Sequence, residues 1–179
     1  MMNTSAKKGW ATPTPRMLRL VAVLVALLTV LPSVVACNLF KKEVPHVDYV
    51  AQTTLDTASE SLKIEATVKS YIDGDTTHFY VSPSAEFPDG VVKARYLAIN
   101  TPESTGKIEP WGKKASNYTK TQLMQATEII IESDTDKWNV DSTGGRHLVY
   151  VWYMPKDSDE YRCLNLELVQ NGLSIACGT

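Results

Sequence analysis

Two β-strands joined by a tight turn are predicted by the segment KIEATVKSYIDGDTTHFYVS, residues 63–82. Over residues 64–72 the apolar side chains fall largely on one parity, which is typical of a half-buried strand. A turn is then favoured by Asp73-Gly74-Asp75, and β-branched and aromatic residues resume over 76–82. The segment therefore indicates a hairpin within a β-rich domain.

Three further strands and two helices are predicted downstream of this hairpin. Pro110 stands where helices often begin, and Asn171-Gly172 is a usual helix stop. Five short strands with helices inserted late predict an α+β, mainly β fold: a five-stranded Greek-key OB-fold barrel with two to three helices. An α+β sandwich of the same elements is the alternative. The further strands are expected over residues 91–99, 128–133 and 147–153, and the helices over about 110–125 and 164–170.

The N-terminal segment has the layout of a secretory signal, with a basic stretch, an apolar run over residues 20–31, and then small residues. The run is short of the ~20 apolar residues that span a bilayer, so a permanent single-pass anchor is the weaker alternative. The sequence Val34-Val35-Ala36-Cys37 resembles the bacterial lipobox, in which a peptidase cuts before a lipid-bearing cysteine. We therefore expect a lipoprotein signal peptide (1–36), a lipidated tether (37–61) and a folded domain (62–179). Lipid on Cys37 would hold the protein at the extracytoplasmic face of a bacterial cell membrane, unless it is shed to the medium.

Charge and cysteine content narrow the classes of function. Residues 37–179 carry 14 basic and 20 acidic residues, a net charge of about −6. A dedicated nucleic-acid binder usually has a basic groove, so this balance argues mildly against one. Cys163 and Cys177 could form a disulfide in an oxidising exterior or remain free thiols, and cysteine spacing does not favour a zinc site.

Several polar residues lie where they could form a site. Asp75 begins a strand directly after a turn, and Arg95 lies in an apolar strand, where a guanidinium needs a partner or solvent. Alternation does not show which way Arg95 points, because both parities of its strand are apolar. Asn100, the Thr101 carbonyl and Glu103 supply oxygens of the kind that Ca²⁺ or Mg²⁺ binds. Along an extended strand, however, Arg95 and Asn100 would be ~17 Å apart.

A second candidate region is the loop that precedes the last predicted strand. It contains Gly144-Gly145-Arg146, where two glycines would let backbone or ligand approach a guanidinium. A flexible loop with no further role is the plain alternative for this region.

Together these motifs resemble the staphylococcal nuclease, or thermonuclease, family. The motifs run in family order over about residues 64–176, and further matches are the helix entry over 111–116 and the segment 168–173. The resemblance implies an OB-fold, Ca²⁺-dependent phosphodiesterase that cleaves DNA and RNA to 5′-hydroxyl and 3′-phosphate ends. It implies that Asp75, Asn100 and the Thr101 carbonyl hold Ca²⁺ with Asp73 behind them, that Glu103 orients or deprotonates the attacking water, and that Arg95 and Arg146 grip the phosphate.

Three departures from the family pattern bear on this expectation. Asn100 stands where the family usually has Asp, which removes a negative charge and predicts weak Ca²⁺ binding, in the ~10⁻⁴ to 10⁻³ M class of extracellular sites. Gly144 stands where an aromatic residue is common in the family. The family also normally continues into a third helix at the position where this sequence ends with Gly178-Thr179. A non-catalytic OB-fold lipoprotein that binds nucleic acid or protein is the alternative function, and a lipoprotein for small molecules is a third.

Overall fold

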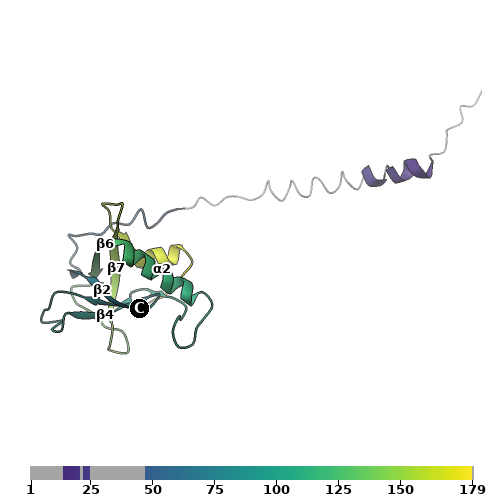
Figure 1. The fold of residues 1–179 in the computed structure, drawn as a ribbon. Helices are drawn as coiled ribbons and strands as arrows, with labels where there is room; N and C mark the ends of the chain where they lie inside the picture. Colours follow the sequence, from purple (N-terminus) through teal and green to yellow (C-terminus); the bar gives the residue numbers. More distant parts are fainter. Residues whose placement is uncertain (1–13, 21, 25–46, 179) are drawn as a thin grey trace, which may run out of the picture. The chain divides into compact units, whose positions relative to one another are not determined.

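The computed structural model describes residues 14–20, 22–24 and 47–178 (Figure 1). The chain divides into two units, Met1–His46 and Val47–Thr179. In the first unit, residues 15–20 and 22–24 are helical, whereas the predicted lipobox and Cys37 lie outside the described residues. Within the described ranges, no helix combines the length and the hydropathy that crossing a membrane requires.

The second unit is built on a sheet that closes on itself. Its strands follow the order β1-β6-β7-β4-β3-β2, and β1 and β2 are successive parts of one strand interrupted at Ala66. The Ala66 amide donates to the Ile129 carbonyl at 2.9 Å, which keeps the interruption against β6. The fold is therefore α+β, mainly β, as predicted, and is consistent with an OB-type barrel. The strands are β1 (Lys63–Glu65), β2 (Thr67–Asp73), β3 (Thr76–Tyr80), β4 (Val91–Tyr96), β6 (Ala126–Glu132) and β7 (His147–Pro155).

The barrel core follows from alternation along the strands. In β4, Val92, Ala94 and Tyr96 are buried, whereas Lys93 and Arg95 lie on the outer face. Strand β4 pairs antiparallel with β3 and parallel with β7, so its register positions side chains from both neighbours. Each fully buried apolar side chain contributes roughly 1.5–3 kcal/mol to the stability of the fold. The packed inner face therefore holds β4 in place, together with the side chains on its outer face.

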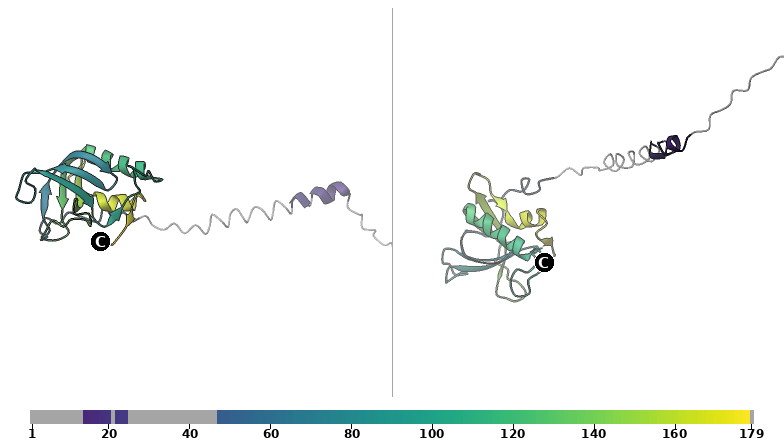
Figure 2. Two further views of the ribbon diagram at one scale, coloured as in Figure 1. Left: turned by 90° about the horizontal axis from the view of Figure 1, so that it is seen from below. Right: turned by 45° about the vertical axis from the view of Figure 1, so that its right-hand side comes forward.

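Two helices and three short strands complete the second unit (Figures 1 and 2). Helix α2 (Gly112–Gln125) buries Ala115, Thr119 and Leu123, and it lies beside α3 (Leu164–Gln170). Strand β5 (Ile99–Asn100) pairs with β9 (Ile175–Ala176), and β8 (Arg162–Cys163) pairs with β7. The β5–β9 pairing links the segment after β4 to the last strand of the described chain.

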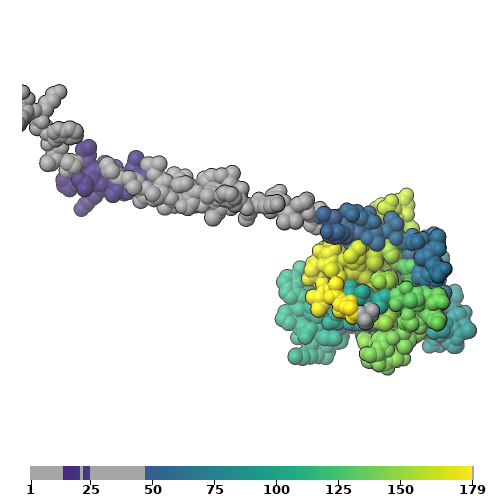
Figure 3. Space-filling model, turned by 180° about the vertical axis from the view of Figure 1, so that it is seen from behind, coloured from purple at the N-terminus to yellow at the C-terminus, as the bar shows by residue number. Residues whose placement is uncertain are grey.

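Residues 47–61 pack on the barrel, although we expected the folded domain to begin at residue 62. The amides of Tyr49 and Val50 donate to Gln170 Oε1 at 2.8 and 3.2 Å, and Val50 is 1% exposed. Figure 3 shows this segment, in blue, against the yellow C-terminal region. The compact unit therefore begins at Val47, because burial of Val50 and the Gln170 contacts tie the segment down.

Both cysteines of the barrel are free thiols, so the disulfide alternative does not form in this structure. Cys163 is buried and Cys177 is exposed. Burial raises the pKa of the Cys163 thiol to about 11, which makes it a poor nucleophile.

Candidate functional site

The predicted site begins at Asp75, which is 1% exposed at the turn between β2 and β3. Its Oδ2 accepts a hydrogen bond from the Thr101 amide at 2.7 Å. Its Oδ1 accepts from the Arg95 guanidinium and from Thr76 Oγ1, the latter at 3.1 Å. A buried carboxylate is tolerated because these donors satisfy it. We call Asp75, Arg95, Asn100 and Thr101 the Asp75 cluster.

Arg95 reaches both Asp75 and Asn100 because the chain turns sharply after β4. The register pairs Arg95 with Thr76, next to Asp75, on the outer face of the barrel. The predicted strand over 91–99 instead ends at Tyr96, and Ala98 takes a left-handed conformation with φ 61°. This turn brings Asn100 back, so Arg95 Nη2 donates to Asn100 Oδ1 at 2.5 Å. Arg95 and Asn100 are therefore in direct contact, and not at the separation expected along an extended strand.

Close packing around Gly74 holds the turn against the rest of the cluster. A Cβ at Gly74 would lie 2.8 Å from Thr101 Oγ1 and 2.9 Å from the Ala115 Cβ, so no larger residue fits. Thr119 Oγ1, from α2, donates to the Gly74 carbonyl at 2.6 Å. Within the described part of the chain, the buried Thr101 Oγ1 has no hydrogen-bond partner. Helix α2 thus fixes the β2–β3 turn relative to Thr101.

Glu103 lies next to this cluster and interacts with Asp73. Burial opposes ionisation of Asp73, but hydrogen bonds from Ser104 and Gly74 outweigh burial and lower the pKa of its carboxyl group. A hydrogen bond with Asp73, then desolvation and repulsion from Asp73 and Asp75, raise the pKa of Glu103. The pKa of Asp73 is therefore lowered and that of Glu103 raised. In paired carboxyl groups, such a difference lets one group stay charged while the other accepts a proton.

Arg146 lies in the loop of residues 133–146 between β6 and β7, which we call the Arg146 loop. Its Nε donates to Asp141 Oδ2 at 2.6 Å, and Nη2 lies 2.5 Å from the same oxygen. The parallel β4–β7 register pairs Arg95 with Leu148, two residues after Arg146. From strand geometry, the Arg95 and Arg146 Cα atoms are then roughly 8 Å apart. Among the described contacts of its side chain, none joins Arg146 to the Asp75 cluster.

The structure thus brings together four of the six predicted site residues, with Glu103 adjacent and Arg146 on a neighbouring loop. Sequence reasoning missed Asp141 as the partner of Arg146 and Ser104 as the donor to Asp73. Both partners are short polar residues in turns, so an Asx-type or Ser turn was the available signal.

The oxygen atoms in the Asp75 cluster suit a hard cation. Oδ1 of Asp75 and Oδ1 of Asn100 already surround one positive group, the Arg95 guanidinium. With the Thr101 carbonyl, they offer carboxylate, amide and backbone oxygens, which are the ligand types that Ca²⁺ takes. Among the described residues, no three His, Cys, Asp or Glu side chains group closely enough to hold a metal, so such a site would depend on amide, carbonyl and water oxygens.

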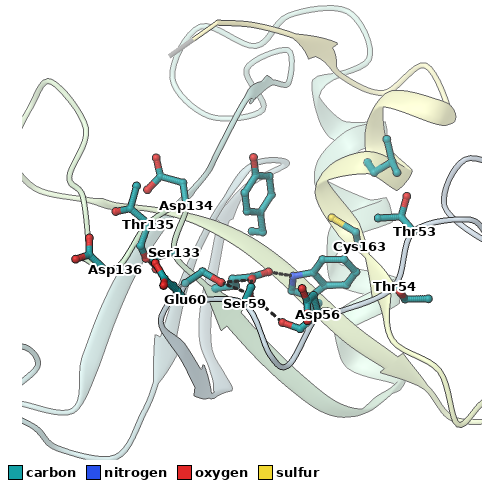
Figure 4. A pocket seen from close by; sticks show the side chains of 15 residues that line it. Thr53, Thr54, Asp56, Ser59, Glu60, Ser133, Asp134, Thr135, Asp136 and Cys163 are labelled. Carbon is teal, nitrogen blue, oxygen red and sulfur yellow. Dashed lines mark hydrogen bonds between the residues drawn. The ribbon is translucent and has the colours of Figure 1, made fainter.

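Two cavities differ in their relation to these residues. One, of about 420 Å³, includes Asn100 and Thr101 in its lining. A larger one, of about 780 Å³, lies between residues 53–61 and the strands β6 and β7 (Figure 4). Its lining contains none of the six predicted site residues, so the smaller cavity is the relevant one for the candidate site.

Comparison with known proteins finds a matching family model and a curated relative. Residues 93–178 match the family model described as staphylococcal nuclease homologue. A thermonuclease from Staphylococcus intermedius is 33% identical over 112 residues, which cover 61% of this chain and 57% of that protein. The chain therefore matches less than two thirds of the length of this curated relative. The match over residues 93–178 and the closed mixed barrel together make this part of the chain similar to the staphylococcal nuclease family.

Proposed function

We propose that this protein is a Ca²⁺-dependent nuclease that hydrolyses DNA and RNA to 5′-hydroxyl and 3′-phosphate ends. The observation that carries the proposal is the Asp75 cluster, in which Arg95 and the oxygens of Asp75 and Asn100 converge beside Glu103. The match to a nuclease family model over residues 93–178 and the similarity to a thermonuclease support the same reaction class.

In this proposal, Asp75, Asn100 and the Thr101 carbonyl hold the metal. Bound Ca²⁺ would stabilise the negative charge that develops on the phosphate oxygens during in-line attack. Asp75 supplies the single carboxylate of the set and has little freedom to move, because the Thr101 amide and Thr76 hold it in place. A set with one carboxylate and one amide predicts weak binding, since ligand charge tunes Ca²⁺ affinity.

Glu103 is proposed to orient the attacking water and accept its proton. A general base works best when its pKa lies near the operating pH, and the environment of Glu103 shifts its pKa in that direction. Asp73 keeps its charge because Ser104 Oγ donates to it at 2.6 Å.

Arg95 and Arg146 are proposed to stabilise charge on the phosphate. Each guanidinium can donate two parallel hydrogen bonds to phosphate oxygens, which a lysine cannot reproduce. In this structure each one is paired with a carboxylate, Arg95 with Asp75 and Arg146 with Asp141. Phosphate would therefore replace, or share, a carboxylate partner at each guanidinium.

The test is cleavage of labelled single-stranded DNA by the full-length protein in detergent, with Ca²⁺, Mg²⁺ or EGTA in parallel. We expect cleavage with Ca²⁺, 5′-hydroxyl ends on the products, and loss of cleavage in EGTA and in Glu103→Ala. Glu128→Gln, at an exposed acid of β6, is the matched control and should cleave normally. Undiminished cleavage in EGTA would contradict the metal assignment, and DNA binding without cleavage would favour the non-catalytic alternative.

We also propose that lipid on Cys37 attaches the barrel to the extracytoplasmic face of a bacterial membrane. The lipobox-like sequence before Cys37 supports this proposal. Labelling of cells with a fatty-acid probe should mark the wild-type protein and the control Cys177→Ser, whose thiol is exposed, but not Cys37→Ser. Equal labelling of all three proteins would exclude attachment through Cys37.

A further inference from the structure

The cavity of about 420 Å³ adjoins the candidate metal site on the side of α2. Its volume is within the range of roughly 300–1,000 Å³ that is usual for small-molecule sites. Residues from three separate segments line it, so it is a junction of the loop after β4, the start of α2 and the segment after α3. The lining residues that matter here are Asn100, Thr101, Trp111, Lys114 and Glu109.

Trp111 is the one aromatic residue in the described lining, and 61% of its surface is accessible. It precedes α2 in a left-handed conformation with φ 73°, and it makes no side-chain capping bond. The residue before a helix is usually Ser, Thr, Asp or Asn, and a left-handed backbone raises the conformational energy of a bulky residue. The indole therefore does not stabilise the start of the helix, and backbone strain of this kind is typical of functional positions.

The position of Trp111 is tied to that of Glu103. At the next residue, Gly112, an added Cβ would lie 2.0 Å from the Glu103 carbonyl oxygen, so the two backbones are in direct contact. The Gly112 amide also donates to the Glu109 carbonyl at 3.1 Å, and the Glu109 amide donates to the Glu103 carbonyl at 2.9 Å. Trp111 is thus one residue from a rigid contact with the proposed general base.

The charge beside the indole is positive. Lys114 Nζ lies 4.4 Å from the centre of the Trp111 ring, one turn along α2. Glu109, the one acidic residue in the described lining, accepts a hydrogen bond from the Glu103 amide at 3.2 Å. A flat aromatic surface with an ammonium group beside it matches a nucleotide, which has a stacking base and a negatively charged phosphate.

We propose that Trp111 and Lys114 form a nucleotide subsite, in which the indole stacks on a base next to the scissile phosphate and Lys114 pairs with the adjoining phosphate. The subsite rests on the proposed nuclease function and adds a binding determinant to it. Asn100 and Thr101 belong both to this cavity and to the candidate metal site, so a single strand could occupy both at once. Stacking tolerates any base, so the subsite would select unpaired nucleic acid rather than a sequence.

The test is the binding of a fluorescent single-stranded oligonucleotide in EGTA, by anisotropy, with the full-length protein in detergent. Loss of an aromatic stacking contact should weaken binding of Trp111→Ala on the order of 10- to 100-fold, whereas Trp111→Tyr should bind nearly as well as wild type. Lys114→Ala should bind more weakly and show a smaller salt dependence. Met124→Ala, at an exposed position on the same helix, should have no effect.

A second arm uses an oligonucleotide that lacks bases at its central positions. The wild-type protein should bind it as weakly as Trp111→Ala binds the normal strand, and Trp111→Ala should not distinguish the two strands. In the cleavage assay with Ca²⁺, Trp111→Ala should raise KM with little change in kcat, because stacking is retained in the ground state and the transition state.

The outcomes separate this inference from the proposed nuclease function. Normal cleavage together with equal binding by wild type and Trp111→Ala would overturn the subsite and leave the nuclease proposal standing. Absence of both cleavage and oligonucleotide binding in the wild type would overturn both. A shift from dimer to monomer in Trp111→Ala, without a change in oligonucleotide binding, would identify the surface as a contact between copies and would overturn the subsite.

Discussion

The Asp75 cluster and the Arg146 loop each hold one candidate phosphate-binding arginine, but they hold it in different ways. Arg95 extends from a strand of the closed barrel, and its carboxylate partner is 1% exposed at the end of the neighbouring strand pair. Arg146 lies in a loop, its side chain is 36% exposed, and its partner Asp141 lies five residues away in the same loop. One arginine is therefore positioned by the barrel and the other by a local turn.

Because of this difference, substitutions at the two arginines should differ in how much they lower the stability of the fold. Contacts at Arg95 connect segments that are distant in the sequence, so their loss affects the fold as well as any reaction. Contacts at Arg146 are local and partly solvated, so their loss should leave the fold nearly unchanged. The comparison predicts that substitutions in the two regions affect different measurements.

Removal of each arginine in turn is the strongest test. Arg146→Ala should slow phosphodiester cleavage ~100-fold or more, the usual cost of about 3 kcal/mol for losing a transition-state donor, and change the unfolding free energy by less than ~1 kcal/mol. Arg95→Ala should slow cleavage at least as much and also lower the unfolding free energy by about 3 kcal/mol, because it leaves Asp75 buried without its guanidinium. Cleavage assays and urea unfolding of both variants measure the difference. Equal losses of stability in the two variants would contradict the conclusion that the barrel positions Arg95 and a local turn positions Arg146.

Two glycines give a test with a smaller expected effect, because one is closely packed against Glu103 and the other is not. Gly112→Ala would place a Cβ 2.0 Å from the Glu103 carbonyl oxygen, so it should lower the unfolding free energy by about 1–3 kcal/mol and displace Glu103. At Gly144 an added Cβ would have nothing within 4 Å, so Gly144→Ala should lower the unfolding free energy only through its left-handed backbone, φ 69°, by about 1 kcal/mol. Urea midpoints and cleavage rates should show that only Gly112→Ala impairs both stability and catalysis. A larger stability loss at Gly144 would indicate that the Arg146 loop is more tightly packed than its contacts suggest.

Patterns in the sequence predicted the elements of the barrel but only part of the site. Helix α3 has the predicted bounds, and β3 and β7 lie where β-branched and aromatic residues indicated strands. The approach of Asn100 to Arg95 was not predictable, because it depends on a left-handed Ala98, and alanine carries no turn signal. The contact between Gly112 and Glu103 likewise depends on tertiary packing.

A change of one proposed ligand tests whether Ca²⁺ is coordinated by the Asp75 cluster. Asn100→Asp adds a carboxylate to the Asp75 cluster, so Ca²⁺ should bind about tenfold more tightly, since ligand charge tunes affinity. Ser142→Asp adds the same charge to the exposed Arg146 loop and should change Ca²⁺ affinity less than about twofold, because exposed charges are screened by solvent. Calorimetric titration with Ca²⁺ measures both. An equal gain in the two variants would mean that net charge, rather than coordination, controls Ca²⁺ binding.

The smallest expected effect concerns the pH dependence of the Arg146 loop. Burial opposes ionisation of Asp141, but hydrogen bonds from Thr143 and Arg146 outweigh burial and lower the pKa of its carboxyl group from 3.8 to about 2. Because the pKa is lower in the folded state, the contribution to stability is complete above the unfolded pKa and is lost as the pH falls toward 2. Its size should be about 1 kcal/mol or less, since Arg146 is partly solvated. Urea midpoints of wild type and Asp141→Asn should therefore differ slightly at pH 7 and converge between about pH 4 and pH 2. A difference that stayed constant over this range would show that the Asp141 carboxylate acts through its shape, and the local ion pair would then play no part in holding Arg146.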